Sequence, residues 1–131
     1  MLTLDDMGNC FEGIVPATLA TASADGIPNV TRISKVHYVD ADHVSISNQF
    51  LSKTQRNLAE NPHGALVLID PLTYDSYKLT IVYERAEKRG PLFDRMHRDI
   101  EAIAALTGMT GIFKLRSADV HRVTSVEKER A

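Results

Sequence analysis

The short links between extended, alternating segments restrict the fold of this chain most strongly. Asp25-Gly26 lies between two such segments within residues 15–39, and Asp40-Ala41-Asp42 leads from the second to a third at 43–48. Asp-Gly is typical of tight hairpins because glycine adopts a positive φ at no steric cost. Parallel neighbours would need a crossover of a dozen or more residues, so these turns predict mostly antiparallel pairing.

Three further segments have the patterns of strands. Residues 64–70, "GALVLID", are continuously apolar and predict a central strand. Residues 77–87 alternate apolar and polar side chains, as a half-buried strand does, and residues 111–126 predict a last long strand.

Two segments instead predict helices. The first is short, begins near Ser52 and ends before Pro62. The second spans residues 91–107 and carries an apolar stripe of Leu92, Met96, Ile100 and Ile103 with Phe93 and Leu106 on its flank. We therefore expect a mainly β protein, a six-stranded and mostly antiparallel β-barrel, closed or partly split, with α-helices at its ends.

Composition excludes several functional classes. The chain has 131 residues, which suits a single domain over 1–131, and its net charge of −2 predicts no nucleic-acid partner. Its apolar runs are too short for a membrane span, and the N-terminus lacks the pattern of a signal peptide. One cysteine, Cys10, fits a reducing cytoplasm. The five scattered histidines predict no metal site, and the missing GxSxG motif argues against a hydrolase.

The most informative polar cluster surrounds the stretch "QFLSKTQRNLAENP". A helix N-terminus favours an anion, and Ser52, Lys53 and Thr54 open the helix just after the strand that ends in Ser47-Asn48. If the strand that bears Arg32 pairs with the strand at 43–48, these groups could surround one phosphate. Spacing alone leaves the alternative open, in which Ser52 caps its helix, Lys53 is solvated and Arg32 pairs with a surface carboxylate.

Two motifs add a resemblance to this cluster. "PATLATASADGIPNVTRIS" followed by "HVSISNQFLSKTQRNLAENPHGALVLID" resembles the pyridoxamine 5′-phosphate oxidase-like family of FMN-binding split barrels. The likeness runs from residue 14 to about residue 85, and "TGMTGIFKLRSADVHRV" resembles the segment that closes the barrel in one branch of the family.

The resemblance implies a set of cofactor-binding residues. It implies that Arg32 and Lys53 bind the FMN phosphate, with a hydroxyl from Thr54 or Ser52. The isoalloxazine or ribityl chain would lie along four further residues, which are Ile33, Ser34, Ser47 and Asn48. The family is usually a homodimer with flavin at the subunit interface, where Ser76 and Tyr77 would reach the partner's flavin.

The chain also departs from the true oxidase. Thr54 stands where the oxidase has a second basic residue, and His37 stands where the oxidase has a lysine that holds its substrate. The oxidase's C-terminal Arg-x-His and Trp are absent. Pyridoxamine phosphate is therefore a poor candidate substrate.

Two functional classes follow from the resemblance. One is an FMN-dependent oxidoreductase that acts on an unidentified small molecule or on reduced nicotinamide, with catalytic residues unknown and His37 and His121 as candidate proton donors. The other is a non-catalytic FMN-binding sensor or interaction module. Binding of haem or deazaflavin is a third alternative, and the lack of a well-placed histidine pair argues against haem.

Overall fold

Seven strands and two α-helices follow one another in the computed structural model, which describes residues 2–48, 52–108 and 114–129. The strands are β1 (Ala17–Ala22), β2 (Pro28–Ile33), β3 (Val36–Asp40), β4 (His43–Asn48), β5 (His63–Ile69), β6 (Ser76–Glu87) and β7 (Ser117–Glu129). The helices are α1 (Ser52–Glu60) and α2 (Pro91–Thr107), and short 3₁₀ turns occupy Leu4–Asp6 and Cys10–Glu12.

The strands form one sheet in the order β2-β1-β5-β6-β7-β4-β3, with antiparallel pairing throughout. This confirms the predicted mainly β, antiparallel split barrel, although there are seven strands instead of six. The extra strand arises because the predicted strand at 28–39 breaks at Ser34-Lys35 into β2, which pairs with β1, and β3, which pairs with β4. The expected pairing of the strand that bears Arg32 with the strand at 43–48 is therefore wrong. The last strand begins at Ser117, and positions 111–113 of its predicted start lie outside the described residues.

The barrel interior holds the main apolar core. Alternate residues of β6 contribute to it, and Leu79 and Ile81 are fully buried. Leu66 and Leu68 of β5 lie in the same core, while the intervening Val67 is half-buried. The period of two in the sequence therefore identifies the inward face of both strands.

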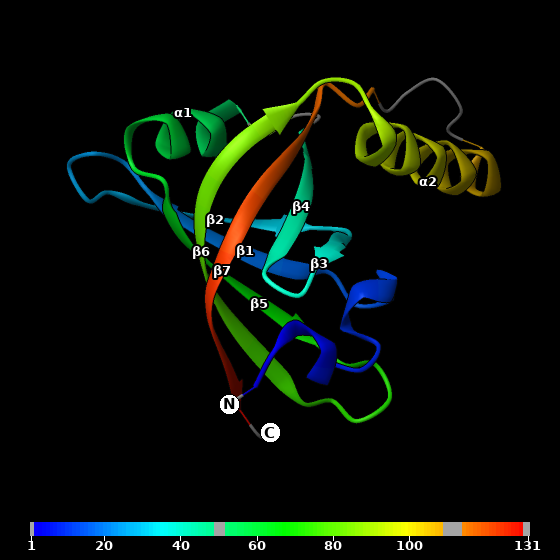
Figure 1. Cartoon of the computed structure of the whole chain (residues 1–131), viewed down its shortest axis with the longest axis horizontal. Helices are drawn as coiled ribbons and strands as arrows, with labels where there is room; N and C mark the ends of the chain where they lie inside the picture. Colours follow the sequence, from blue (N-terminus) through cyan, green and yellow to red (C-terminus); the bar gives the residue numbers. More distant parts are fainter. Residues whose placement is uncertain (1, 49–51, 109–113, 130–131) are drawn as a thin grey trace.

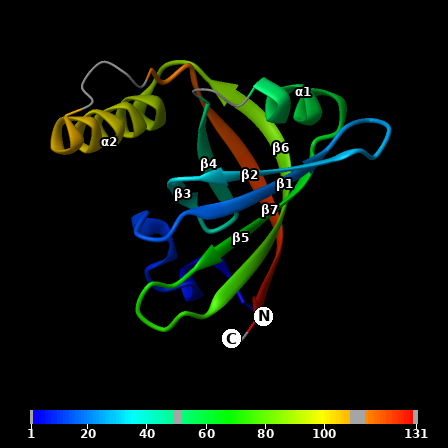
Figure 2. The ribbon, with the colours of Figure 1, turned by 180° about the vertical axis from the view of Figure 1, so that it is seen from behind.

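Both helices lie at the end of the barrel opposite the two chain termini (Figures 1 and 2). In α1, the Asn57 amide donates a hydrogen bond to Thr21 Oγ1 of β1 at 3.2 Å. In α2, Met96 is buried against Ala118 of β7 and Leu115, and it accepts a hydrogen bond from Ser45 Oγ at 3.1 Å. Helix α1 thus packs against β1, while α2 covers β4 and β7 before it extends beyond the barrel (Figure 1).

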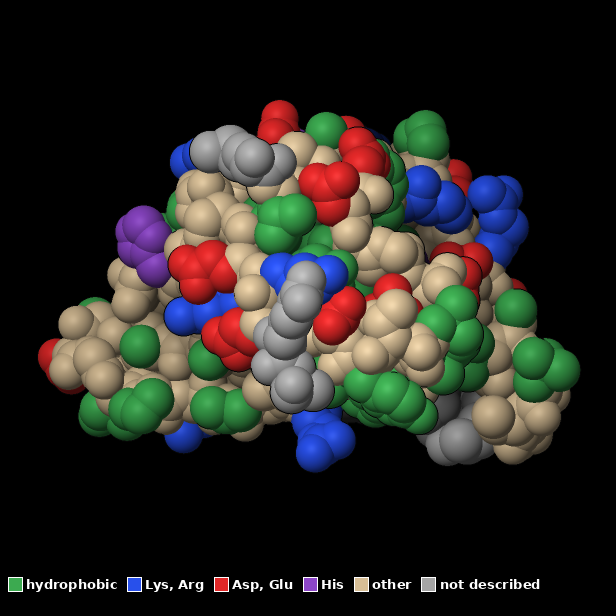
Figure 3. All heavy atoms as spheres, turned by 90° about the horizontal axis from the view of Figure 1, so that it is seen from below, with side chains coloured by type: hydrophobic (Ala, Val, Ile, Leu, Met, Phe, Trp, Pro, Cys, Tyr) green, Lys and Arg blue, Asp and Glu red, His purple; other side chains and the backbone are tan. Residues whose placement is uncertain are grey.

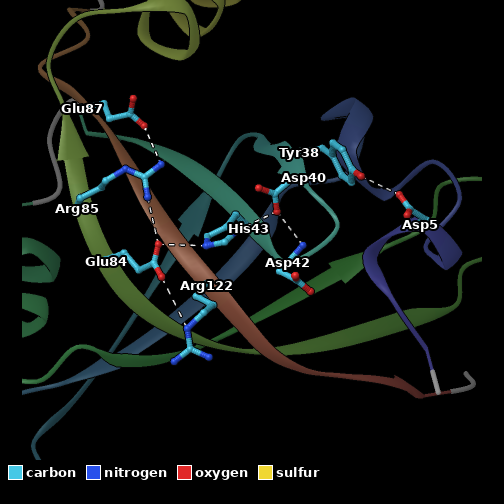
Figure 4. A network of polar contacts seen from close by, with 9 residues as sticks. All are labelled: Asp5, Tyr38, Asp40, Asp42, His43, Glu84, Arg85, Glu87 and Arg122. Carbon is cyan, nitrogen blue, oxygen red and sulfur yellow. Dashed lines mark hydrogen bonds and ion pairs between the residues drawn. The ribbon is translucent and has the colours of Figure 1, made fainter.

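A surface network of charges connects the turn between β3 and β4 with β6. The ring of His43 bridges Asp40 Oδ1 at 2.8 Å and Glu84 Oε1 at 3.1 Å. Glu84 also contacts Arg85 at 3.1 Å and Arg122 of β7 at 3.7 Å (Figure 4). These contacts join four neighbouring strands, β3, β4, β7 and β6, at their solvent side.

Acidic and basic side chains are interspersed on the face at the end of the barrel where the termini lie (Figure 3). This face therefore presents no continuous basic surface of the kind that binds nucleic acid. Among the described residues, no helix is long and apolar enough to span a membrane.

Candidate functional site

The predicted phosphate-binding residues lie on two elements that contact each other, α1 and β2. Thr54 is buried in the first turn of α1, and its Oγ1 accepts a hydrogen bond from the Asn29 amide of β2 at 3.4 Å. Arg32 lies on the same strand but on its exposed face, and Lys53 is exposed at the start of α1. Within the described residues, neither Arg32 nor Lys53 has an ion-pair partner. The interpretation of Arg32 as the partner of a surface carboxylate therefore has no support in these contacts.

The remaining predicted residues near this junction differ in exposure. Ile33 is buried in the barrel core, and Ser34 is exposed at the bend between β2 and β3. Ser47 is half-buried on β4. Asn48 is buried at the end of β4. Its side-chain amide donates a hydrogen bond to Ser117 Oγ at 3.3 Å, and its backbone carbonyl accepts one from the backbone N–H of Arg116 at 2.8 Å. The Ser52 side chain lies outside the described part of the chain.

Ser76 and Tyr77 lie at the other end of the barrel, at the start of β6 (Figure 1). Ser76 is half-buried between Ile69 and Glu129 on the neighbouring strands. The Tyr77 ring lies in the core, and its hydroxyl donates to the Asp6 carbonyl at 3.4 Å. One chain therefore does not bring these two residues to the junction of α1 and β2.

A pocket of about 490 Å³ opens between α1, the C-terminal end of β6 and the N-terminal end of β7. Its lining comprises Asn48, Gln55, Leu58, Ala59, Tyr83, Ala86, Lys88, Arg116, Ser117 and Asp119. A second hollow of about 440 Å³ shares Asn48, Gln55, Ala59 and Arg116 with it and adds Arg56. Asn48 is the one predicted cofactor-binding residue in this lining.

A buried carboxyl group forms part of the pocket wall. Asp119 is 4% exposed, and its two oxygens accept hydrogen bonds from Ser117 Oγ at 2.7 Å and from Gln55 Nε2 at 3.1 Å. Burial raises the pKa of Asp119, while these two hydrogen bonds lower it. Burial and the neighbouring Asp119 carboxyl also raise the pKa of the Tyr83 phenol. The wall therefore combines an acid with polar groups that hold it in place.

Sequence reasoning missed Asp119, Ser117 and Gln55 as site residues. The available signal was the spacing Ser117-x-Asp119-x-His121, which places three polar groups on one face of a strand. All three are buried, and Asp119 and His121 pair with the core residues Ile46 and Val44 of β4, so this face of β7 points into the barrel. The cross-strand pair Asn48–Ser117 extends the polar strip to β4, whereas Asp119 lies opposite the apolar Ile46.

The two candidate proton donors are buried histidines. Burial lowers the pKa of His121 to about 4, and its Nδ1 has no hydrogen-bond partner among the described residues. Burial, followed by the charge of Lys35, lowers the pKa of His37 to about 4, although Asp99 lies 3.5 Å from its Nδ1. Both rings are therefore neutral near pH 7. Within the described residues, no group of three or more His, Cys, Asp or Glu side chains is arranged to hold a metal.

Comparison with known families assigns the chain to one of them. The family model described as pyridoxamine 5′-phosphate oxidase matches residues 5–126. The chain therefore belongs to the pyridoxamine 5′-phosphate oxidase family, as the motifs around Arg32 and Lys53 indicated.

Known proteins resemble the chain either in sequence over part of its length or in fold over most of it. An uncharacterised protein of Methanocaldococcus jannaschii is 44% identical over 50 residues, which cover 37% of this chain and 34% of that protein. The matched stretch thus spans about a third of the curated relative. An FMN-binding protein from Syntrophomonas wolfei has a TM-score of 0.82 at 17% identity, with 98% of this chain and 86% of that chain covered.

Two other proteins of similar structure are named for other cofactors, F420 and haem. An F420 reductase has a TM-score of 0.65 at 17% identity, with 91% of this chain and 94% of that chain covered. The haem storage protein HutZ from Vibrio cholerae has a TM-score of 0.58 at 16% identity, with 86% of this chain and 84% of that chain covered. At these identities the likeness establishes the fold alone.

Proposed function

We propose that this protein binds FMN, with the phosphate at the junction of β2 and α1. One observation carries the proposal: Arg32 of β2 and Lys53 of α1 are exposed cations on the two elements that meet at this junction, and neither has an ion-pair partner among the described residues. The hydrogen bond between Asn29 and Thr54 connects strand and helix, and the helix N-terminus adds backbone donors for an anion. These residues suit a phosphate group.

The wider set of cofactor contacts follows from the same proposal. Ser52 or Thr54 would add a hydroxyl at the phosphate, and the flavin would extend along four residues, Ile33, Ser34, Ser47 and Asn48. Bound FMN would supply redox chemistry, while this chain would bind the cofactor and orient it. The buried Asn48 amide, held by Ser117, supports a rigid edge beside the cofactor.

We also propose that two copies of the chain form a homodimer with flavin at their interface. Val30 is 65% exposed on the same face of β2 as Arg32, and Ile27 is 60% exposed on the preceding turn. Exposed apolar side chains beside a predicted cofactor site favour a protein partner there. In a dimer, Ser76 and Tyr77 would belong to the partner side of the flavin, as the family resemblance implies.

We expect purified protein mixed with excess FMN to keep flavin absorption after desalting. An Arg32→Ala/Lys53→Ala variant should lose FMN affinity by about 100-fold, because two charge-assisted contacts disappear. A Lys78→Ala/Arg98→Ala variant removes two exposed cations elsewhere and should keep the wild-type spectrum. Light scattering of the same samples would give the oligomeric state.

The outcomes distinguish the cofactor alternatives. Equal flavin retention by wild type and the Arg32→Ala/Lys53→Ala variant would mean that the FMN phosphate does not bind at these two residues. Retention of haem or deazaflavin with no retention of FMN would overturn the FMN assignment.

We further propose that the FMN-bound protein is an oxidoreductase that acts on a small molecule. The pocket beside Asn48 supports this proposal because it offers room for a substrate near the proposed cofactor. Oxidation of NADH or NADPH by the FMN-loaded protein, followed by absorbance, would support an enzyme. Absence of turnover with a panel of acceptors would favour the alternative, a non-catalytic FMN-binding sensor or interaction module.

A further inference from the structure

The Asp119 carboxyl lacks the partner that a buried charge requires. Both of its hydrogen-bond donors, Ser117 and Gln55, are neutral. Within the described residues it forms no ion pair. A buried carboxylate without a cation is costly, so this position favours either a protonated acid or a cation brought by a ligand. Because Asp119 lines an open pocket, a ligand can reach it.

The pocket rim, in contrast, carries positive charges without acidic partners among the described residues. Lys88 and Arg116 line the pocket with exposed side chains. Neither has an ion-pair partner among the residues that the structure describes. Arg56 adds a third cation in the adjoining hollow. The rim therefore favours an anionic group, while the buried wall favours a cationic one.

The pocket lining also includes apolar surface. Leu58 and Ala59 of α1 and the Tyr83 ring of β6 line the pocket. Arg116 and Asp119 are three positions apart along extended chain, which separates their backbones by about 10 Å at the rise of a β-strand. A ligand that reached both would need an apolar part between its charged ends.

We propose that this pocket binds a small zwitterion of the ω-amino acid class, with its ammonium group at Asp119 and its carboxylate at Arg116 and Lys88. A simple amine would be repelled by the cationic rim, and a simple carboxylate would gain nothing from the buried acid. The raised pKa of Asp119 agrees with a carboxyl group that lacks a cation when the pocket holds no ligand.

This inference does not require flavin to be bound, and among the described residues Asn48 is the one that this pocket shares with the proposed flavin site. Arg32, Lys53 and Thr54 are not among the residues that line the pocket. The binding experiment uses the full chain without added FMN, so its result is independent of flavin retention.

Three probes of matched length test the two charged ends separately. Calorimetric titration with 6-aminohexanoate should give a dissociation constant at least about tenfold lower than titration with hexanoate or hexylamine. The first probe carries both charges, and each of the others carries one. Equal affinity for 6-aminohexanoate and hexanoate would overturn the role of Asp119, and no binding of 6-aminohexanoate at about 10 mM would overturn the whole proposal.

Substitutions then locate the probe. The Asp119→Asn variant should bind 6-aminohexanoate about tenfold or more weakly than wild type, because the charge-assisted contact is lost. It should also no longer bind 6-aminohexanoate more tightly than hexanoate. The substituted side chain can keep both hydrogen bonds, since the Gln55 amide can turn its oxygen toward the new NH₂ group. Asp25→Asn, at an exposed turn, is the matched control and should bind like wild type.

The rim provides a second test that does not disturb the core. Arg116→Gln/Lys88→Gln changes two exposed side chains, so the fold should persist. This variant should bind 6-aminohexanoate about tenfold more weakly and hexylamine no more weakly than wild type. Near-ultraviolet circular dichroism would show whether the Asp119→Asn protein is folded. If either this folded variant or the rim variant binds 6-aminohexanoate as tightly as wild type, the ligand binds elsewhere.

Discussion

At the scale of single residues, burial decides the protonation of the two inner histidines. His121 is 1% exposed, and its ring centroid lies 5.4 Å from that of Tyr83 in an edge-to-face contact. Within the part of the chain that the structure describes, its Nδ1 has no hydrogen-bond partner. A charged imidazolium there would lose its hydration without gaining an ion pair. His37 differs, since Asp99 is near, yet Lys35 and Arg95 offset that carboxylate. Both rings are therefore held neutral by the fold.

The pH dependence of stability should show this effect. The pKa of each of the two histidines falls from 6.5 to about 4 on folding. Below pH 6.5 the unfolded chain binds protons that the folded chain does not, so stability falls as pH decreases toward 4. Between pH 7 and pH 5 each histidine should cost about 2 kcal/mol of unfolding free energy. Urea unfolding at the two pH values measures this loss.

A His121→Phe variant isolates one of these contributions. It keeps an aromatic ring beside Tyr83 and should lose about 2 kcal/mol less than wild type between pH 7 and pH 5. His63→Gln, at an exposed position, should retain the wild-type dependence. The contribution of Asp119 has the opposite sign but is common to all three proteins. An unchanged pH dependence in His121→Phe would mean that His121 is not the group that titrates.

At the scale of elements, α2 buries only part of its apolar stripe. Met96 is fully buried, and Leu92, Phe93 and Ile100 pack against the same cluster. The stripe continues in the sequence, but Ile103 is 51% exposed and Leu106 is 88% exposed. The reason is that the second half of α2 extends beyond the strands that the first half covers (Figure 2). Periodicity predicted the face correctly, but not the length over which a partner surface exists.

Stability should therefore depend on position along α2. Met96→Ala should lower the unfolding free energy by about 2–5 kcal/mol, because it leaves a cavity against Ala118 and Leu115. Leu106→Ala, also apolar but exposed, should change it by about 0.5 kcal/mol or less. Chemical denaturation of both variants provides the comparison. Similar losses in the two proteins would contradict the observed packing of α2.

At the scale of the whole molecule, the last strand connects the two parts of the sheet. β7 pairs with β6 on one side and with β4 on the other. The partner of Val120 on β4 is Ser45, and its partner on β6 is Arg85. Because β4 and β7 are far apart in sequence, their pairing completes the barrel only after long loops have closed.

A proline in the middle of β7 should prevent this closure. Val120→Pro removes a backbone donor from a strand that has neighbours on both sides, at a cost of about 3 kcal/mol or more. Val120→Ala, which keeps the backbone donor, should cost about 1–2 kcal/mol through lost packing alone. Thermal unfolding followed by circular dichroism separates the two variants. A Val120→Pro protein as stable as Val120→Ala would mean that this part of β7 contributes little to the stability of the sheet.

Local sequence patterns were enough to predict most of the fold and one part of the candidate site. Alternation identified the strands, Pro62 ended the short helix, and the Asp-Gly and Asp-Ala-Asp turns predicted antiparallel pairing. Each of these signals acts over a few residues, where φ/ψ preferences and side-chain period decide the structure. The motif around Lys53 also placed a polar cluster at the start of α1, and its cofactor remains a prediction.

Only the tertiary structure decided which distant residues meet. The bend at Ser34-Lys35 depends on β2 and β3 finding different partner strands, β1 and β4. The pocket wall unites Gln55 with Asp119 across 64 positions of sequence. No local preference encodes such a contact, because it arises when strands and helix pack around a shared core. The sequence by itself thus determined the elements and the family, whereas packing determined the buried acid and the cationic rim of its pocket.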